Sequence, residues 1–185
     1  MRKRIIKMFM LVETQIDKSI QSVTVSDFEI GETAMQNENR IDKLDIKIDK
    51  LCQRIFALAQ PVATDLRFIM SSLRIGNEIE RIGDIALDVI GRSEVVRPYQ
   101  GILDEYRVTG IFAEIHRLAA GCAEAYTNNN NELAREIIAG CHQAEENCRQ
   151  AFNDVISRMT EKSEVIVIAT DLILIIRDLE RIANH

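Results

Sequence analysis

The sequence contains few residues that end helices and few that build an aromatic β core. Its 185 residues include 8 glycines, 2 prolines, 3 tyrosines and no tryptophan. An all-β sandwich or barrel needs more turn residues and more aromatic side chains than this. Because hydrophobic residues still make up 46% of the chain, we expect a packed core built from long helices. The fold class predicted from composition is all-α.

Long apolar runs and paired cysteines are also missing. The longest apolar stretch, residues 165–176, is interrupted by Thr170 and Asp171 and is too short to span a membrane. The four cysteines form no CxxC pair, so we interpret them as small buried residues rather than as zinc ligands or disulfides. The basic segment 1–7 is not followed by the cleavage site of a signal peptide. We therefore expect a cytoplasmic protein without a transmembrane segment.

The charge balance and the motif content exclude further classes. The chain has 23 basic and 29 acidic residues, which gives a net charge of -6. An acidic chain has no overall attraction for nucleic acid, so we expect no nucleic-acid partner. The sequence contains no GxSxG, P-loop, GxGxxG or HExxH motif. We expect a protein that is not an enzyme.

Apolar residues recur at helical spacing along six segments, which predicts six helices. The first three cover about residues 5–25, 32–60 and 61–90, and the last begins near Ser163. The segment 95–101, which contains Pro98, is predicted to link two halves, 1–94 and 102–185. Residues 80–84 read ERIGD and residues 180–184 read ERIAN, so a shift of 100 superposes the ends of the halves. This faint duplication predicts two similar three-helix bundles.

Acidic residues interrupt the apolar pattern of two of these helices. Glu80 occupies an apolar seam position of the third helix, where an ionised carboxylate is costly unless a cation accompanies it. Asp84 lies four residues later on the same face, and Asp88 continues that line. The second helix offers Glu38 and Asp42 with the same spacing. If the two helices are antiparallel neighbours, these two pairs of carboxylates face one another.

Converging carboxylates repel one another and require cations. Oxygen ligands of this kind bind hard divalent or ferric ions, so the candidates are iron, zinc, manganese or magnesium, as one ion or a multinuclear cluster. The alternative interpretation is that the acids are solvated or paired, with Arg74 or Arg81 beside Glu80. Asp45 and Asp49 are interpreted as surface acids because three lysines are close to them in the sequence.

The second half repeats the acid pattern less completely. Aligning its fifth helix on the second with a shift of 104 makes Glu146 a candidate ligand and His142 a further possibility. The end of the chain adds Glu180 and Asn184. Because Asn184 stands where the first half has an acid, the second site carries less charge.

Three segments resemble the PhoU family of phosphate-uptake regulators. They are residues 60–67 (QPVATDLR), 80–84 (ERIGD) and 180–183 (ERIA), and the resemblance extends over essentially the whole chain. It implies a fold of two three-helix bundles. It also implies metal clusters held by paired E(D)xxxD motifs, which here match Glu38 with Asp42 and Glu80 with Asp84.

The resemblance also implies a function. Members of the family connect a phosphate ABC transporter to a sensor histidine kinase in the cytoplasm, and they repress the phosphate-starvation response when phosphate is plentiful. We therefore expect a negative regulator of phosphate uptake that reaches the membrane only through its partners. The exposed acid arrays suit a homodimer.

The chain departs from the family pattern in three ways. It begins within the usual first helix, it ends early in the sixth, and it carries Asn184 where the second motif normally has Asp. We expect a truncated second bundle whose metal site is weaker, differently occupied or completed by residues outside this chain. Other functions also stay open: a carboxylate-bridged metalloenzyme or metal store, the regulatory domain of a sodium/phosphate cotransporter, or a purely structural helical module.

Overall fold

The computed structural model describes residues 1–25, 29–161 and 166–185, and in these residues every regular element is helical. The elements are α1 (Arg2–Thr24), α2 (Glu29–Ala59), α3 (Ala63–Val96), η1 (Arg97–Tyr99), α4 (Gln100–Glu105), α5 (Val108–Asn128), α6 (Asn131–Glu161) and α7 (Ile166–Asn184). The all-α prediction is confirmed. The predicted start of the last helix, Ser163, lies outside the described residues.

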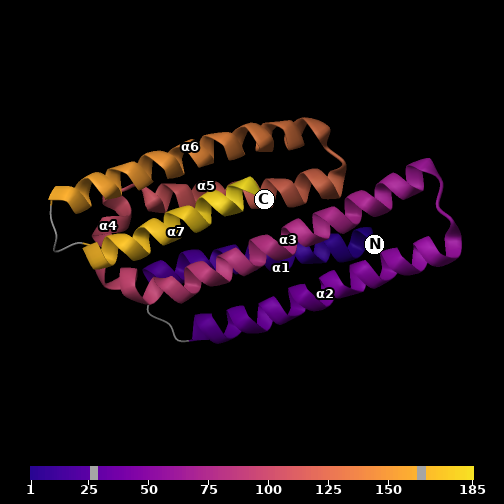
Figure 1. Ribbon diagram of the computed structural model, residues 1–185, viewed down its shortest axis with the longest axis horizontal. Helices are drawn as coiled ribbons and strands as arrows, with labels where there is room; N and C mark the ends of the chain where they lie inside the picture. The colour runs from indigo at the N-terminus through magenta and orange to yellow at the C-terminus, as the bar shows by residue number, and fades with distance from the viewer. Residues whose placement is uncertain (26–28, 162–165) are drawn as a thin grey trace.

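The long helices form two groups that share one core (Figure 1). Helices α1, α2 and α3 pack against one another, and so do α5, α6 and α7. In addition α3 contacts α7 and α1 contacts α5, which leaves α2 and α6 at the outer edges. One hydrophobic cluster runs through both groups and includes Ile16, Ile79, Phe112 and Ile175. The two groups share this core, so the packing does not test the predicted domain boundaries at residues 94 and 102. Those boundaries stay a prediction.

The predicted linker at residues 95–101 is wrong, since this segment is helical. Helix α3 continues to Val96, which is fully buried, and η1 and α4 follow directly. Arg97 fixes this connection: its Nε donates to the carbonyl of Ser22 at 2.8 Å and its Nη2 to Oγ of Ser93 at 3.1 Å. Pro98 falls inside the short 3-10 turn, where its missing N–H breaks no long helix.

An asparagine-rich turn separates α5 from α6. Asn129 adopts a left-handed conformation (φ 49°) and ends α5, a role for which asparagine is suited. The side-chain oxygen of Asn130 then accepts hydrogen bonds from the backbone N–H groups of Glu132 and Leu133, each at 3.1 Å. This is an N-cap, and it begins α6.

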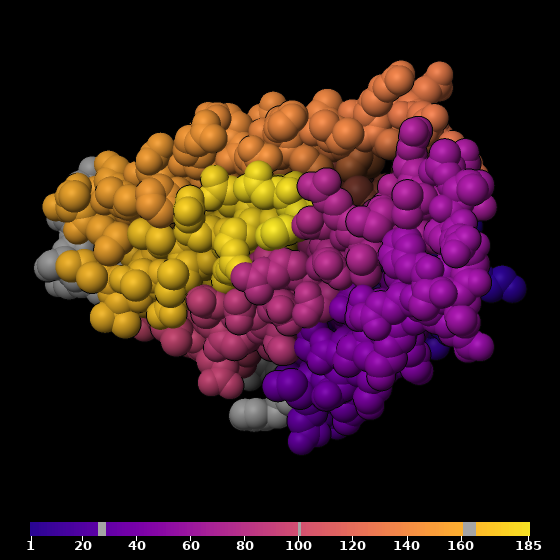
Figure 2. All heavy atoms as spheres, turned by 45° about the vertical axis from the view of Figure 1, so that its right-hand side comes forward, coloured from indigo at the N-terminus to yellow at the C-terminus, as the bar shows by residue number. Residues whose placement is uncertain are grey.

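The helices are amphipathic, and their lengths differ between the two groups. The apolar face of α2 is buried at Ile41, Leu44 and Ile48. Helix α3 has 34 residues and α7 has 19, and Figure 2 shows α7 (yellow) stopping between α6 (orange) and α3 (magenta). None of the helices in the described parts of the chain combines the length and the hydrophobicity that a transmembrane span requires.

Candidate metal centre

Two glycines bring α3 close to the acidic face of α2. A Cβ atom on Gly83 would lie 3.1 Å from Cδ1 of Ile41 and 3.3 Å from Oε2 of Glu38. A Cβ atom on Gly76 would lie 3.3 Å from Oδ1 of Asp45. These contacts are closer than most Cβ contacts in proteins, so a larger residue at either position would require the facing side chains of α2 to move by a few tenths of an ångström.

Glu38 is the most perturbed of these carboxylates. Its side chain is buried, its Oε2 accepts a hydrogen bond from Nε2 of Gln15 at 3.4 Å, and its Oε1 is buried without a hydrogen-bond partner. Burial, followed by the negative charges of Asp84, Asp42 and Glu80, raises the pKa of Glu38 to about 8. The two predicted pairs therefore do lie within electrostatic range of one another.

The neighbouring carboxylates are perturbed in the same direction. Burial raises the pKa of Glu80, and Asp84, Asp45 and Asp42 add to that increase while Arg81 opposes it. The pKa of Asp45 is also raised, first by burial and then by Asp49 and Asp42. We name Glu38, Asp42, Asp45, Glu80 and Asp84 the first acid cluster.

Asp45 is a member of the cluster that the sequence analysis missed. It was predicted to be a surface acid because of nearby lysines, yet it is partly buried and faces the backbone of Gly76. The alternative pairing of Glu80 with an arginine is not what the structure shows. Instead, Nη1 of Arg81 lies 3.4 Å from Oδ2 of Asp84, and both side chains are more than 40% exposed. An exposed pair at this distance offsets little of the negative charge.

Asp88, the remaining predicted ligand of the first half, does not join the cluster. Its side chain is exposed, and its charge acts on Asp178 of α7. Asp178 itself is buried between Arg92, at 3.0 Å, and Arg181, at 2.9 Å. Asp88 therefore faces an ion-paired contact between α3 and α7 rather than the acidic face of α2.

The buried positions of α6 match those of α2 with a shift of 107, not 104. The matching buried pairs are Ile30 with Ile137, Asn37 with Ala144, Ile41 with Cys148, Leu44 with Ala151, and Ile48 with Val155. In this alignment Glu145 takes the place of Glu38, and Arg149 takes the place of Asp42. The predicted alignment of His142 and Glu146 with the two acids is wrong.

The side-chain contacts of residues 142, 145 and 146 support the shift of 107. Oε2 of Glu146 pairs with Nη1 of Arg149 at 2.7 Å on the surface, and the His142 side chain is 74% exposed. Glu145 is the more buried of the two neighbouring glutamates, at 24% against 47% exposed.

A second group of carboxylates surrounds a thiol in the second half. Burial, followed by the charges of Glu180, Glu114 and Glu145, raises the pKa of Cys148 to about 12. Each of these acids has a partner: Glu180 pairs with Arg177 at 2.7 Å, Glu114 accepts a hydrogen bond from Asn147 at 2.8 Å, and Oε1 of Glu145 lies 3.7 Å from Nδ1 of His142. Sequence reasoning named Glu180 but missed Glu114 and Glu145. We name Glu114, Glu145 and Glu180 the second acid cluster.

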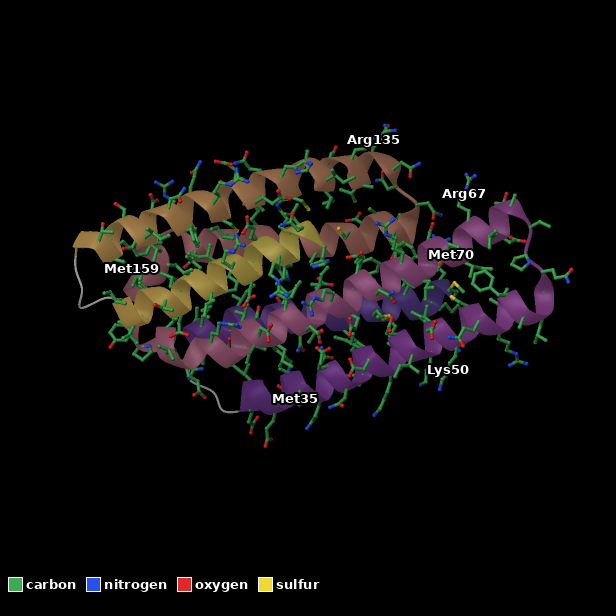
Figure 3. All side chains as sticks on the ribbon, viewed as in Figure 1. Met35, Lys50, Arg67, Met70, Arg135 and Met159 are labelled. Carbon is green, nitrogen blue, oxygen red and sulfur yellow. The ribbon has the colours of Figure 1, made fainter. Side chains whose placement is uncertain are left out.

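The two clusters differ in how well they fit a metal ion. Across residues 1–25, 29–161 and 166–185, no three carboxylate, imidazole or thiol groups converge closely enough to hold an ion in this side-chain arrangement. The first cluster nevertheless supplies oxygen donors, excess negative charge and an unpartnered buried oxygen on Glu38, which together suit a hard cation. Figure 3 shows the side chains of α2 and labels Met35 and Lys50, between which the three α2 members of the cluster fall in the sequence.

The duplicated segments each match the same family model. The model of the PhoU domain matches residues 5–92 and again residues 110–185. The chain belongs to the PhoU family. The resemblance carried by the PVATDLR and ERIGD segments is thereby confirmed.

Proteins that are named as PhoU homologs match nearly the whole length of this chain. The PhoU homolog of Aquifex aeolicus, named a phosphate-specific transport system accessory protein, is 26% identical over 180 residues, which cover 97% of this chain and 81% of the relative. The homolog of Pseudomonas aeruginosa, with the same name, is 25% identical over 185 residues, which cover 100% of this chain and 76% of the relative.

Solved PhoU structures share the fold. The crystal structure of PhoU from Pseudomonas aeruginosa superposes with a TM-score of 0.91 at 24% identity, covering all of this chain and 88% of the other. The phosphate transport system regulatory protein PhoU from Streptococcus pneumoniae gives a TM-score of 0.85 at 22% identity, covering 98% of this chain and 86% of the other. The likeness confirms the PhoU fold.

Proposed function

We propose that this chain is a regulatory accessory protein of phosphate transport whose first acid cluster binds a hard metal ion. Family membership and the names of the relatives support the role in phosphate transport. One observation carries the metal proposal: Glu38 is buried with an unpartnered oxygen, among three further carboxylates that raise its pKa.

In this proposal Glu38, Asp42, Glu80 and Asp84 hold the ion. Magnesium or manganese suits the site well, because such ions take oxygen ligands and can retain waters where the protein does not supply all of them. A bound cation would neutralise the repulsion between α2 and α3 and so lock the two helices together. Asp45 would add negative charge at the edge of the site.

The finer regulatory role follows from the family resemblance. We propose that the chain acts in the cytoplasm as a negative regulator, with a phosphate ABC transporter and a sensor histidine kinase as partners, and that it forms a homodimer. We propose a non-enzymatic role because the groups that perturb Glu38 and Glu80 are carboxylates and one arginine, without a histidine or a nucleophile among them.

The metal proposal is tested by elemental analysis of protein purified without an affinity tag or added metal. We expect stoichiometric metal in the parent, or uptake on titration with Mg²⁺ or Mn²⁺, and loss of both in the double variant Glu80→Ala/Asp84→Ala. The matched control is Glu132→Ala/Glu136→Ala, which removes two exposed acids at the same spacing from α6. Equal metal binding by both double variants would contradict the proposed site.

The regulatory proposal is tested separately in cells. The chain is expressed in a bacterium that lacks its own accessory protein and carries a phosphate-starvation reporter. We expect the parent to restore repression in phosphate-rich medium. A folded parent that leaves the reporter fully active would contradict the regulatory role while leaving the metal result unaffected.

A further inference from the structure

Helix α2 carries its acidic and its basic side chains on opposite sides. Asp45 faces Gly76 of α3. Lys43 and Lys47 each lie two positions from Asp45, and residues two positions apart on an α-helix are about 200° apart around its axis. Figure 3 shows the labelled Lys50 on the side of α2 that is away from α3. The first acid cluster therefore lies on one side of α2, and the basic residues lie on the other.

Five basic residues form a continuous stripe on this outer side of α2. They follow one another at spacings of three, four, three and four, and all are exposed: Arg40, Lys43, Lys47, Lys50 and Arg54. The stripe extends roughly 21 Å at 1.5 Å per residue. None of the five forms an ion pair in the parts of the chain that the structure describes. Because like charges at these spacings destabilise a helix, the stripe is not explained by the stability of α2.

Helix α1 adds three basic residues to the same surface. Nη1 of Arg4 donates to the backbone carbonyl of Lys47 at 3.0 Å, and the carbonyl of Leu11 also accepts a hydrogen bond from α2. Lys7 lies between Arg4 and Leu11 at spacings of three and four, and Lys18 follows Leu11 by seven residues, so both share the side of α1 that faces α2. We name these three residues and the five basic residues of α2 the basic face.

The matching helix of the second half has no such stripe. The shift of 107 that matches α2 to α6 carries the five basic positions to uncharged or acidic residues: Asn147, Gln150, Asp154, Ser157 and Glu161. Both helices lie at the outer edges and bury matching apolar positions, so their packing does not require basic residues. A feature confined to one of two similarly packed helices is expected of a binding surface.

We propose that the basic face binds the surface of an anionic lipid bilayer, so that the chain contacts the membrane directly and not only through its partners. The face gathers eight of the 23 basic residues on a chain with a net charge of -6. An anionic surface attracts this face and repels the acidic remainder, which orients the molecule. Exposed aliphatic side chains border the basic residues: Met10 follows Lys7 by three positions, and Ile46 lies between Lys43 and Lys50. Such side chains gain free energy by entering the region of the lipid headgroups.

Nucleic acid, the other common anionic partner, suits this face less well. Proteins that bind single strands stack the bases on aromatic side chains. The aromatic residue of α1, Phe9, instead packs against Tyr126 of α5, with ring centroids 5.6 Å apart, and so points away from α2. Exposed methionine and isoleucine side chains gain nothing from phosphate groups, whereas a bilayer offers them an apolar layer below its charged surface.

The test is co-sedimentation of the full chain with lipid vesicles at low ionic strength. The vesicles contain phosphatidylcholine alone or equal amounts of phosphatidylcholine and phosphatidylglycerol, and EDTA removes any metal from the first acid cluster. We expect binding to the anionic vesicles only, and a loss of binding at high salt. The variant Lys43→Gln/Lys47→Gln should weaken binding at least tenfold, because each basic residue near an anionic surface contributes about fivefold.

The matched control is Arg135→Gln/Arg149→Gln, which removes two exposed basic residues from α6. It lowers the net charge of the chain by the same amount, and we expect it to leave vesicle binding unchanged. Thermal unfolding verifies that both double variants are folded. Glutamine is a good helix former, so neither variant should lose its helix.

Several results would overturn the proposal. One is no binding of the parent to the anionic vesicles, and another is equal weakening by the two double variants. Binding of a duplex DNA probe without binding to vesicles would assign the basic face to nucleic acid. A dimer, seen by light scattering, that Lys43→Gln/Lys47→Gln makes monomeric would assign the face to a second copy. The vesicles contain no transporter and no kinase, so these results are independent of the regulatory role proposed above.

Discussion

The two halves of the molecule keep the same packing and differ in charge. The four positions that hold carboxylates in the first half, Glu38, Asp42, Glu80 and Asp84, correspond to Glu145, Arg149, Glu180 and Asn184 in the second. The first set has a formal charge of −4, whereas the second has a formal charge of −1. A core requires only apolar volume at its buried positions, and both halves provide it. Carboxylates beside that core have no such packing role, so their concentration in the first half needs another explanation, and the cation site that we propose would be one.

The first prediction compares how much a metal ion stabilises variants of the first half and of the second half. Mn²⁺ at about 100 times its Kd should stabilise the parent by about 2.7 kcal/mol, or roughly 5–10 °C in Tm. The variant Glu80→Ala/Asp84→Ala should lose this increase, whereas Glu180→Ala/Asn184→Ala should retain it. The Tm of each variant is measured by thermal unfolding with and without Mn²⁺. If both variants lose the Mn²⁺-dependent increase in Tm equally, the two halves do not differ in metal binding.

The second prediction concerns the close approach of α2 and α3. Gly83→Val places atoms against Ile41 and Glu38, so it should destabilise the protein by about 1–3 kcal/mol, or roughly 3–10 °C in Tm. Gly91→Val is the matched control in the same helix, because a Cβ atom there meets nothing within 4 Å. Calorimetry of the two variants compares them directly. Equal effects would show that the approach at Gly83 is not tight.

The third prediction concerns a variant that adds to the second half the two carboxylates that it lacks. The variant Arg149→Asp/Asn184→Asp restores carboxylates at the positions of Asp42 and Asp84. We expect it to bind one additional Mn²⁺ per chain in isothermal titration and to be less stable than the parent in the absence of ions, because the added acids repel Glu145 and Glu180. Unchanged stoichiometry would show that charge is not what distinguishes the halves.

The fourth prediction is a pH dependence of the ion-free protein. The pKa of Glu38 is raised from 4.5 to about 8 in the folded state, so folding favours its protonated form. This contribution to stability is complete below pH 4.5 and is lost as the pH rises through 8. Relative to Glu38→Gln, the Tm of the parent should therefore fall between pH 5 and pH 9, with the fall complete once the pH is above 8. Parallel Tm curves for the two proteins would contradict the perturbed state of Glu38.

Much of the fold and half of the acid pattern could be predicted from the sequence. The helical spacing in α2 and the acids spaced four apart on α2 and α3 are local features, and local features determine which face of a helix a residue occupies. Asp45 was missed because its burial depends on Gly76 of another helix, and neighbouring lysines in the sequence gave the opposite indication.

The error in the second half has a geometric cause. Shifts of 104 and 107 differ by three residues, which is close to one helical turn, so both place similar faces of α6 toward the core. Only the buried positions, seen in three dimensions, distinguish them. The helical course of residues 95–101 was missed for a similar reason, because the contacts that hold it come from Ser22, far away in the sequence.

The most direct test of the central claim is anomalous diffraction from crystals of the chain grown with Mn²⁺. We predict a strong peak within ligand distance of at least three of the carboxylates of Glu38, Asp42, Glu80 and Asp84, and a weaker peak or none beside Glu145 and Glu180. Mn²⁺ at the second site alone, or no ion among the four carboxylates, would contradict it.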